Sequence, residues 1–177
     1  DTGTGPRHGI FDRDHKQLFL VSELSNQVFV YSLTEDAAAG TDSSHNSISL
    51  PDFSMRLLHI CSILPSDAVY EEPPASAAIR LSPDERFLYV STRFAEVITV
   101  FKIDHGCLAQ IQQTGCGGIH PRDMVLTPDG RYLLVANRTR GGLVSFQINQ
   151  ETGRLMDICS RVPAPEAVSI VLSQHTI

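Results

Sequence analysis

The sequence is poor in lysine and in long apolar runs. Lys16 and Lys102 are its only lysines, so arginine supplies 12 of the 14 basic side chains. Arginine is favoured where planar, bidentate contact with carboxylate or phosphate is needed, although codon usage produces the same bias. The formal net charge of −6 argues against binding to nucleic acid or to an anionic membrane surface. No apolar run approaches the length of a membrane span or a signal-peptide core.

Paired cysteines are also missing. Cys61, Cys107, Cys116 and Cys159 form no CxxC pair, and no His/Cys cluster has zinc spacing. We therefore expect no metal site and no cofactor. We interpret the four cysteines as buried, small apolar side chains in a reducing compartment, and expect a cytoplasmic protein.

The chain contains a repeat. FDRDHKQLFLVSEL begins at Phe11, LSPDERFLYVSTR at Leu81 and LTPDGRYLLVANR at Leu126, which gives offsets of 70 and 45 residues. Each copy joins a short strand to an Asp-containing turn and then to an apolar strand. Two further apolar stretches follow in every copy, so the repeating unit is four β-strands. Helical periodicity is absent almost everywhere.

Groups of four short strands that repeat every 40 to 50 residues or so are typical of a β-propeller. We predict an all-β fold of four-stranded antiparallel blades at residues 1–64, 75–116 and 120–162, with a lone strand at 167–173. A polar insert at 34–54 is predicted to be a long loop of the first blade. A sandwich of unrelated strands is the alternative.

The chain has too few predicted blades to form a closed ring. Three blades and a strand fall short of the four to eight that a propeller needs. We therefore expect the chain to be part of a larger propeller. Its open edges would be covered by the remaining blades or by self-association.

One end of the blades is predicted to collect charged side chains. In a four-stranded meander, the start of the first strand and the end of the second lie at the same end, which we call the mouth. Arg7 and His8 enter a first strand and Glu23 ends a second, so they should meet there. The repeat adds further residues at this end: Arg122 at the position of Arg7, Thr92 and Asn137 at that of Glu23, Arg93 and Arg138 one residue later, and His120.

A glutamate among arginines is expected to be ionised and paired, and the remaining arginines are then available to an anionic ligand. The alternative is a ring of salt bridges that ties the blades together.

At these residues the sequence resembles the lactonase family with a seven-bladed propeller. That family includes propeller-type 6-phosphogluconolactonase and 3-carboxy-cis,cis-muconate cyclase. The resemblance lies in GTGPRHGIF, LFLVSEL, AAIRLSPDERFLYVSTR, HPRDMVLTPDGRYLLVANR and PAPEAVSIVLS. These segments are similar to the C-terminal half of the family domain.

The resemblance implies that Arg7, Glu23 and Arg93 are catalytic. Arg80 is the second choice for the later arginine, and the family's histidine from an earlier blade would lie upstream of Asp1. Substrate contacts are expected from five residues: His8, Arg80, Arg122, Asn137 and Arg138. Ser22 and Thr92 depart from the asparagine that is commoner in the family.

The resemblance also implies a small anionic substrate, with no nucleic acid or membrane partner. The hypothesis it favours is hydrolysis of a 6-phosphogluconolactone-type sugar lactone. The first alternative is the lactone-forming cycloisomerisation of 3-carboxy-cis,cis-muconate. The second is a propeller, or an inactive fragment of one, that binds partners and catalyses nothing.

Overall fold

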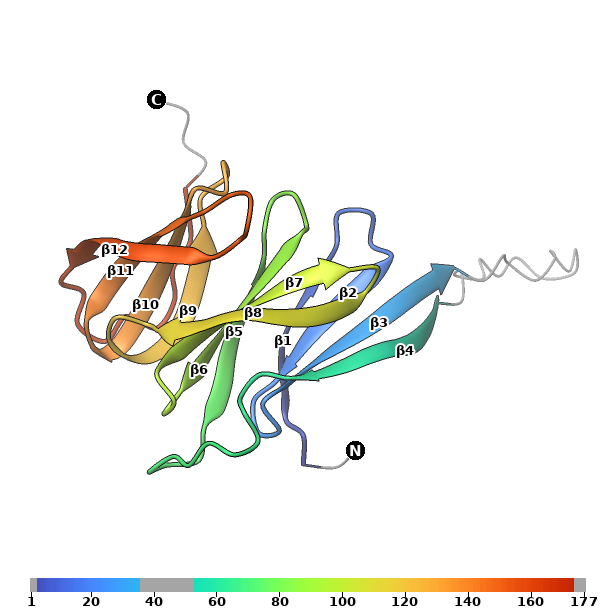
Figure 1. The fold of residues 1–177 in the computed structure, drawn as a ribbon, viewed down its shortest axis with the longest axis horizontal. Helices are drawn as coiled ribbons and strands as arrows, with labels where there is room; N and C mark the ends of the chain where they lie inside the picture. The colour runs from blue at the N-terminus through green and yellow to red at the C-terminus, as the bar shows by residue number, and fades with distance from the viewer. Residues whose placement is uncertain (1–2, 36–52, 174–177) are drawn as a thin grey trace, which may run out of the picture.

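The computed structural model describes residues 3–35 and 53–173, and every regular element in these ranges is a β-strand. The strands form three four-stranded antiparallel sheets, each in simple chain order. Figure 1 shows them as three twisted blades side by side. The predicted all-β fold of propeller blades is therefore confirmed. None of the described residues belongs to a helix that could cross a bilayer.

The three blades have closely similar strands. Blade 1 consists of β1 (Pro6–Phe11), β2 (Gln17–Ser22), β3 (Gln27–Glu35) and β4 (Phe53–Ser62). Blade 2 consists of β5 (Ala75–Leu81), β6 (Phe87–Arg93), β7 (Val97–Asp104) and β8 (Cys107–Gly115). Blade 3 consists of β9 (Ile119–Leu126), β10 (Tyr132–Arg140), β11 (Gly142–Ile148) and β12 (Leu155–Val162).

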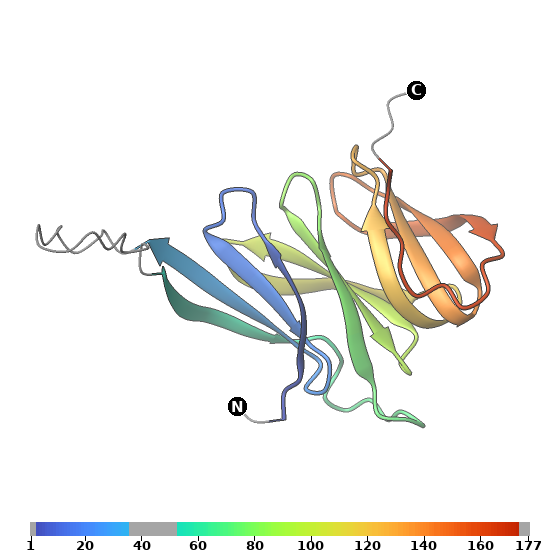
Figure 2. The same ribbon diagram turned by 180° about the vertical axis from the view of Figure 1, so that it is seen from behind.

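The blades pack through their faces, with the first strands on the inside. β5 contacts β1 on one side and β9 on the other, as the view from behind shows (Figure 2). One apolar core lies between blades 1 and 2 and is built around Phe19, Val28 and Phe101. A second lies between blades 2 and 3 and contains Tyr89, Met124 and others. Alternate residues of each strand enter these cores, as the period of a strand requires.

The strand ladders correct the predicted repeat register by one residue. Phe11 pairs with Leu18, Leu81 with Leu88 and Leu126 with Leu133, and four residues further along each second strand is the last residue that pairs with the third strand. That last residue is Ser22, Thr92 or Asn137, and all three are buried. Glu23 is thus equivalent to Arg93 and Arg138, and Thr92 and Asn137 are equivalent to Ser22. The apolar residues of the repeat are compatible with both alignments of Glu23. The length of the turn and the strand pairing are compatible only with the alignment to Arg93 and Arg138.

Two predicted segments differ from the structure. Residues 34, 35, 53 and 54 belong to paired strands, so the long loop predicted at 34–54 is shorter, and its residues 36–52 lie outside the described part of the chain. The lone strand predicted at 167–173 forms no strand. A strand needs a partner for its backbone groups, and no described strand pairs with this segment.

The cysteine prediction was largely wrong. Cys116 is buried, but Cys61 is only partly buried, and Cys107 and Cys159 are exposed, all as free thiols. The three that are not fully buried lie on β4, β8 and β12, the outermost strands of the blades. An outer strand packs on fewer neighbours, so its side chains retain contact with water.

Candidate active site

The mouth is built on a bulge in each first strand. Pairing is interrupted between Pro6 and His8 in β1 and again at the same place in β5 and β9. A bulge adds an unpaired residue and re-aims its side chain. The extra residue is Arg7 in blade 1 and Arg122 in blade 3, while in blade 2 Ala77 holds the equivalent place. The small side chain of Ala77 leaves room in which Arg7 can reach across to blade 2.

Glu23 is held between two arginines from different blades. Arg7 Nε lies 3.4 Å from Glu23 Oε2, and Arg93 Nη2 donates to Glu23 Oε1. Arg7 Nη1 also donates to the Ala77 carbonyl at 2.6 Å, and Arg93 Nε donates to the Ala75 carbonyl at 3.2 Å. The arginine side chains are 16% and 9% exposed and the glutamate side chain is 34% exposed, so the carboxylate is oriented by buried groups yet reachable by solvent.

Burial and like charge shape the electrostatics around Arg7. Desolvation, followed by the nearby Arg93, lowers the pKa of the Arg7 guanidinium. Desolvation and then Arg7 and Arg80 lower the pKa of His8, whose Nδ1 lies 3.1 Å from Arg7 Nη1. His8 is therefore predominantly neutral at pH 7, and its neutral ring can accept from Arg7 or from a ligand.

Beside this ion-paired group lies an open cleft of about 760 Å³. Its wall contains four arginines, Arg7, Arg80, Arg122 and Arg138, together with His8, Gly9, Asp123, Glu166, Val168 and Ser169. Asp123 is the acidic group that organises this wall. Its Oδ1 accepts from Arg80 Nη2 at 2.6 Å and from the Met124 backbone at 2.8 Å. Its Oδ2 accepts from Ser169 Oγ at 3.2 Å and from the Ile170 backbone at 3.0 Å, which fixes the C-terminal segment over blade 3.

Arg122 and Arg138 are the cationic groups left for a ligand. In the described ranges, neither side chain forms an ion pair or a hydrogen bond with a protein group, and both line the cleft. Desolvation, then the charges of Arg93 and Arg138, lower the pKa of His120, which contacts the Phe94 ring edge-on at 5.6 Å. Like charges gathered around one imidazole indicate that the mouth as a whole is electropositive.

The structure brings together most of the residues predicted from the sequence. Arg7, Glu23 and Arg93 are in direct contact, and the cleft beside them receives four of the five predicted substrate contacts: His8, Arg80, Arg122 and Arg138. Asn137 is placed elsewhere, beneath the mouth and in the wall of a neighbouring pocket.

Sequence reasoning missed Asp123, Glu166 and Ser169. Asp123 had a signal, because it occupies the repeat position of His8 directly after an arginine. Glu166 and Ser169 had none, because only the path of the chain after β12 brings them to the cleft.

Comparison with known proteins agrees with this architecture. The sequence profile described as "Lactonase, 7-bladed beta-propeller" matches residues 1–172. The chain is 32% identical to a 6-phosphogluconolactonase of Bacillus subtilis (strain 168), over 95% of this chain and 44% of that protein. It is also 32% identical to a 6-phosphogluconolactonase of Formosa agariphila, over 88% of this chain and 40% of that protein.

Solved structures give the same result. A protein from Lactobacillus plantarum superimposes with a TM-score of 0.80 and 31% identity, over 96% of this chain and 45% of the other. The periplasmic gluconolactonase PpgL of Pseudomonas aeruginosa superimposes with a TM-score of 0.79 and 27% identity, over 94% and 42%.

Three meander blades with a cationic mouth define a segment of a β-propeller. The chain belongs to the seven-bladed β-propeller lactonase family, because the family profile covers almost its entire length. It spans less than half the length of the curated relatives named above, at 44% and 40%.

Proposed function

We propose that this chain contributes its mouth to the hydrolysis of a small anionic sugar lactone of the 6-phosphogluconolactone type. The observation that carries the proposal is the juxtaposition of an accessible carboxylate held by arginines, Glu23, with a cleft in which Arg122 and Arg138 have no ion-pair or hydrogen-bond partner among the described residues. Relatives named 6-phosphogluconolactonase support the same reaction class.

The geometry suits substrate binding by charge. Guanidinium groups form paired hydrogen bonds with the oxygens of phosphate or carboxylate. Arg122 and Arg138 take the anionic group of the substrate, while Arg80, fixed by Asp123, borders the same space. Glu23 neutralises only part of the charge of Arg7 and Arg93, so an anion entering the mouth meets a favourable potential.

In the hydrolytic step, Glu23 accepts a proton from a water molecule whose oxygen attacks the lactone carbonyl carbon. The carbonyl oxygen becomes an oxyanion that Arg7 or Arg93 stabilises in a partly buried site. The ring C–O bond then breaks, and the leaving oxygen takes up the proton to give the hydroxy acid. Ring opening needs no redox partner.

We also propose that the protein works in the cytoplasm. All four cysteines are free thiols, two of them exposed, which fits a compartment in which thiols stay reduced.

The test is steady-state hydrolysis of 6-phosphogluconolactone by the complete polypeptide that contains this chain. We expect Glu23→Gln to lower kcat about 10²- to 10⁴-fold, the usual contribution of a general base, with unchanged circular dichroism. Glu151→Gln removes an exposed carboxylate from the opposite end of blade 3 and should leave kcat unchanged.

Two other outcomes separate the alternatives. Consumption of 3-carboxy-cis,cis-muconate and not of the lactone would assign the site to the cycloisomerase. Turnover of neither compound, or wild-type kcat in Glu23→Gln, would remove the enzymatic role of this carboxylate and favour the binding scaffold.

A further inference from the structure

In blades 1 and 2, the turn between the second and third strands is closed against the neighbouring blade by its last side chain. In blade 1 this residue is Asn26. Its Oδ1 accepts from the Ser76 backbone at 2.9 Å and from Ser76 Oγ at 2.8 Å, and its Nδ2 donates to the Pro74 carbonyl at 2.9 Å. In blade 2 it is Glu96, whose Oε2 accepts from the His120 backbone at 2.5 Å. Both side chains fill the space between the turn and the chain that leads into the next blade.

Blade 3 has glycine at this position. The third strands begin by pairing at Gln27, Val97 and Gly142, so the residue equivalent to Asn26 and Glu96 is Gly141. Gly141 has a φ of +102°, and a Cβ there would lie 2.7 Å from Gly118 Cα, so the backbone excludes a larger residue. The closing side chain is therefore missing, and a pocket of about 470 Å³ lies between this turn and residues 161–165. We call it the turn pocket.

The turn pocket is cationic. Three arginines line it, Arg138, Arg140 and Arg161, and its wall contains no acidic side chain. Within the described residues none of the three forms an ion pair; Arg161 Nη1 donates to the Gly117 carbonyl. Glu96 lines the adjoining pocket, but its oxygens already accept from the backbone of Phe94 at 3.1 Å and of His120.

A buried acceptor in the same wall lacks a donor. Asn137 is 1% exposed, and its Nδ2 donates to the Cys116 carbonyl at 3.3 Å. Its Oδ1 has no hydrogen-bond partner in the described structure. A buried carbonyl oxygen without a donor is costly. The equivalent residues Ser22 and Thr92 both have side-chain hydrogen bonds, so the unpartnered oxygen is peculiar to the blade with the turn pocket.

We propose that the turn pocket binds a small polyhydroxy acid. The arginines hold its anionic group, and a neighbouring hydroxyl group donates to Asn137 Oδ1. Among the side chains of the two sites, only Arg138 lines both the turn pocket and the cleft, so the turn pocket is a second anion site beside the proposed active site. The inference goes beyond the proposed function, because lactone hydrolysis does not require it.

The experiment is calorimetric titration of the complete polypeptide with gluconate, which carries one carboxylate and five hydroxyl groups. The double variant Arg140→Gln, Arg161→Gln removes two charges that are specific to the turn pocket, and we expect it to weaken one binding event at least tenfold. Both arginines are exposed, so folding should persist, and circular dichroism checks it. Arg154→Gln removes an exposed arginine of the same blade outside the pocket and serves as the matched control.

Two further measurements separate this site from the cleft. Arg7→Ala should leave the binding of gluconate in the turn pocket intact. Asn137→Ala should weaken the binding of gluconate more than the binding of sulfate, because sulfate has no hydroxyl group to donate. If gluconate does not bind, or if its binding responds to Arg7→Ala and not to the double variant, the turn pocket is not a ligand site. The outcome does not depend on turnover, so it stands apart from the test of lactone hydrolysis.

Discussion

At the mouth, the same position of the repeat holds glutamate in blade 1 and arginine in blades 2 and 3. Glu23, Arg93 and Arg138 are equivalent residues of successive blades, each directly after the last residue of a second strand that pairs with the third strand. Packing of the blades side by side brings such positions close together, so opposite charges at Glu23 and Arg93 form an ion pair between blades. Blade 3 has Arg138 at this position, and because it forms no ion pair within the described residues it remains available to a ligand in the cleft.

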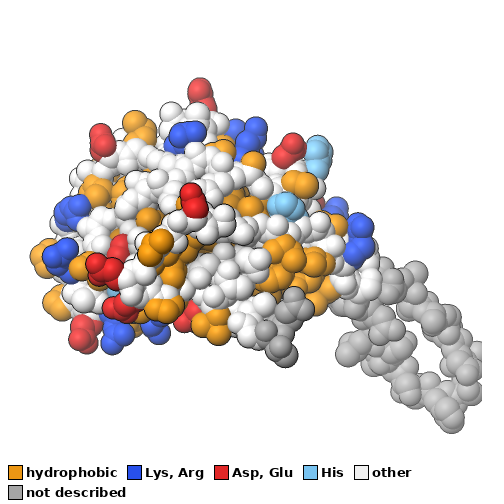
Figure 3. All heavy atoms as spheres, turned by 60° about the horizontal axis from the view of Figure 1, so that its bottom comes forward, with side chains coloured by type: hydrophobic (Ala, Val, Ile, Leu, Met, Phe, Trp, Pro, Cys, Tyr) orange, Lys and Arg blue, Asp and Glu red, His pale blue; other side chains and the backbone are white. Residues whose placement is uncertain are grey.

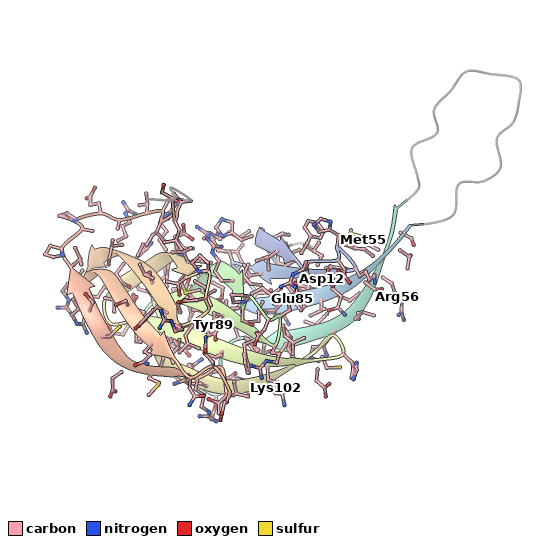
Figure 4. All side chains as sticks on the ribbon, turned by 90° about the horizontal axis from the view of Figure 1, so that it is seen from above. Asp12, Met55, Arg56, Glu85, Tyr89 and Lys102 are labelled. Atoms are coloured by element: carbon pink, nitrogen blue, oxygen red, sulfur yellow. The ribbon has the colours of Figure 1, made fainter. Side chains whose placement is uncertain are left out.

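Tyr89 ties blade 2 to blade 3 through one buried hydrogen bond. Its hydroxyl donates to the Gly153 carbonyl at 2.9 Å, and burial raises the pKa of Tyr89, so it remains a donor throughout the neutral range. Figure 4 shows it inside the molecule, between the second and third blades. Tyr89→Phe leaves a buried carbonyl unpaired, and we expect it to lower the free energy of unfolding by about 1–2 kcal/mol in urea denaturation.

The matched control is Tyr132→Phe, because the Tyr132 hydroxyl has no hydrogen bond with the described residues. We expect the control to differ from wild type by less than about 0.5 kcal/mol. Equal losses in the two variants would show that the Tyr89 bond contributes nothing of its own.

At the scale of strands and turns, local pattern was sufficient to predict the blades. The turns at Asp84 and Asp129 and the alternating apolar residues report on contacts within one hairpin, so they can be recognised without knowing the fold. The mouth was predictable because strand order alone places Arg7 and Glu23 at one end. The one-residue correction of the repeat alignment and the absence of a strand at 167–173 could not be predicted, because both depend on backbone pairing between segments. The binding of Ser169 to Asp123 likewise depends on how the chain returns after β12.

The turn that begins blade 3's second strand should make stability depend on acid. Asp129 accepts from Thr127 Oγ1 at 2.6 Å and from the Arg131 backbone at 3.1 Å, and its other oxygen accepts from Arg131 Nε at 2.6 Å. These bonds, with the Thr127 bond the largest cause, lower the pKa of Asp129 from 3.8 to about 2. A carboxyl group with a lower pKa in the folded state stabilises the fold above its unfolded value and loses this effect as the pH falls through the folded one.

We therefore expect Asp129→Asn to unfold at lower urea concentration than wild type at pH 6. The difference should shrink as the pH falls from about 4 through 2, because the Asp129 carboxyl group becomes protonated and uncharged, as the asparagine side chain already is. Asp157→Asn, which changes an exposed aspartate outside any turn, should show no such convergence. A gap between wild type and Asp129→Asn that stays constant down to pH 2 would contradict the assignment.

At the scale of the whole molecule, blade 1 has one packed face and one open face. Its outward residues form two rows across the sheet, Leu18–Tyr31–Leu57 and Leu20–Phe29–Ile60. Leu57 and Ile60 are 45% and 44% exposed, whereas Phe19 and Val28 on the other face are buried in the core with blade 2. Hydrophobic side chains are also grouped together on the surface in Figure 3. An apolar sheet face of this kind is typical of a surface that packs against another protein segment.

We propose that further blades of the complete polypeptide cover this face, and that the 177-residue chain by itself covers it by self-association. Light scattering after size exclusion should then give a mass above the 19.4 kDa of one chain, rising with concentration. Leu57→Lys with Ile60→Lys should shift the mass toward one chain, because an ammonium group is costly to bury in an apolar contact. Ser54→Lys with Ala109→Lys adds the same charge at exposed positions away from the open face and should not. A wild-type chain that remains at 19.4 kDa at all concentrations would show that the open face does not drive association.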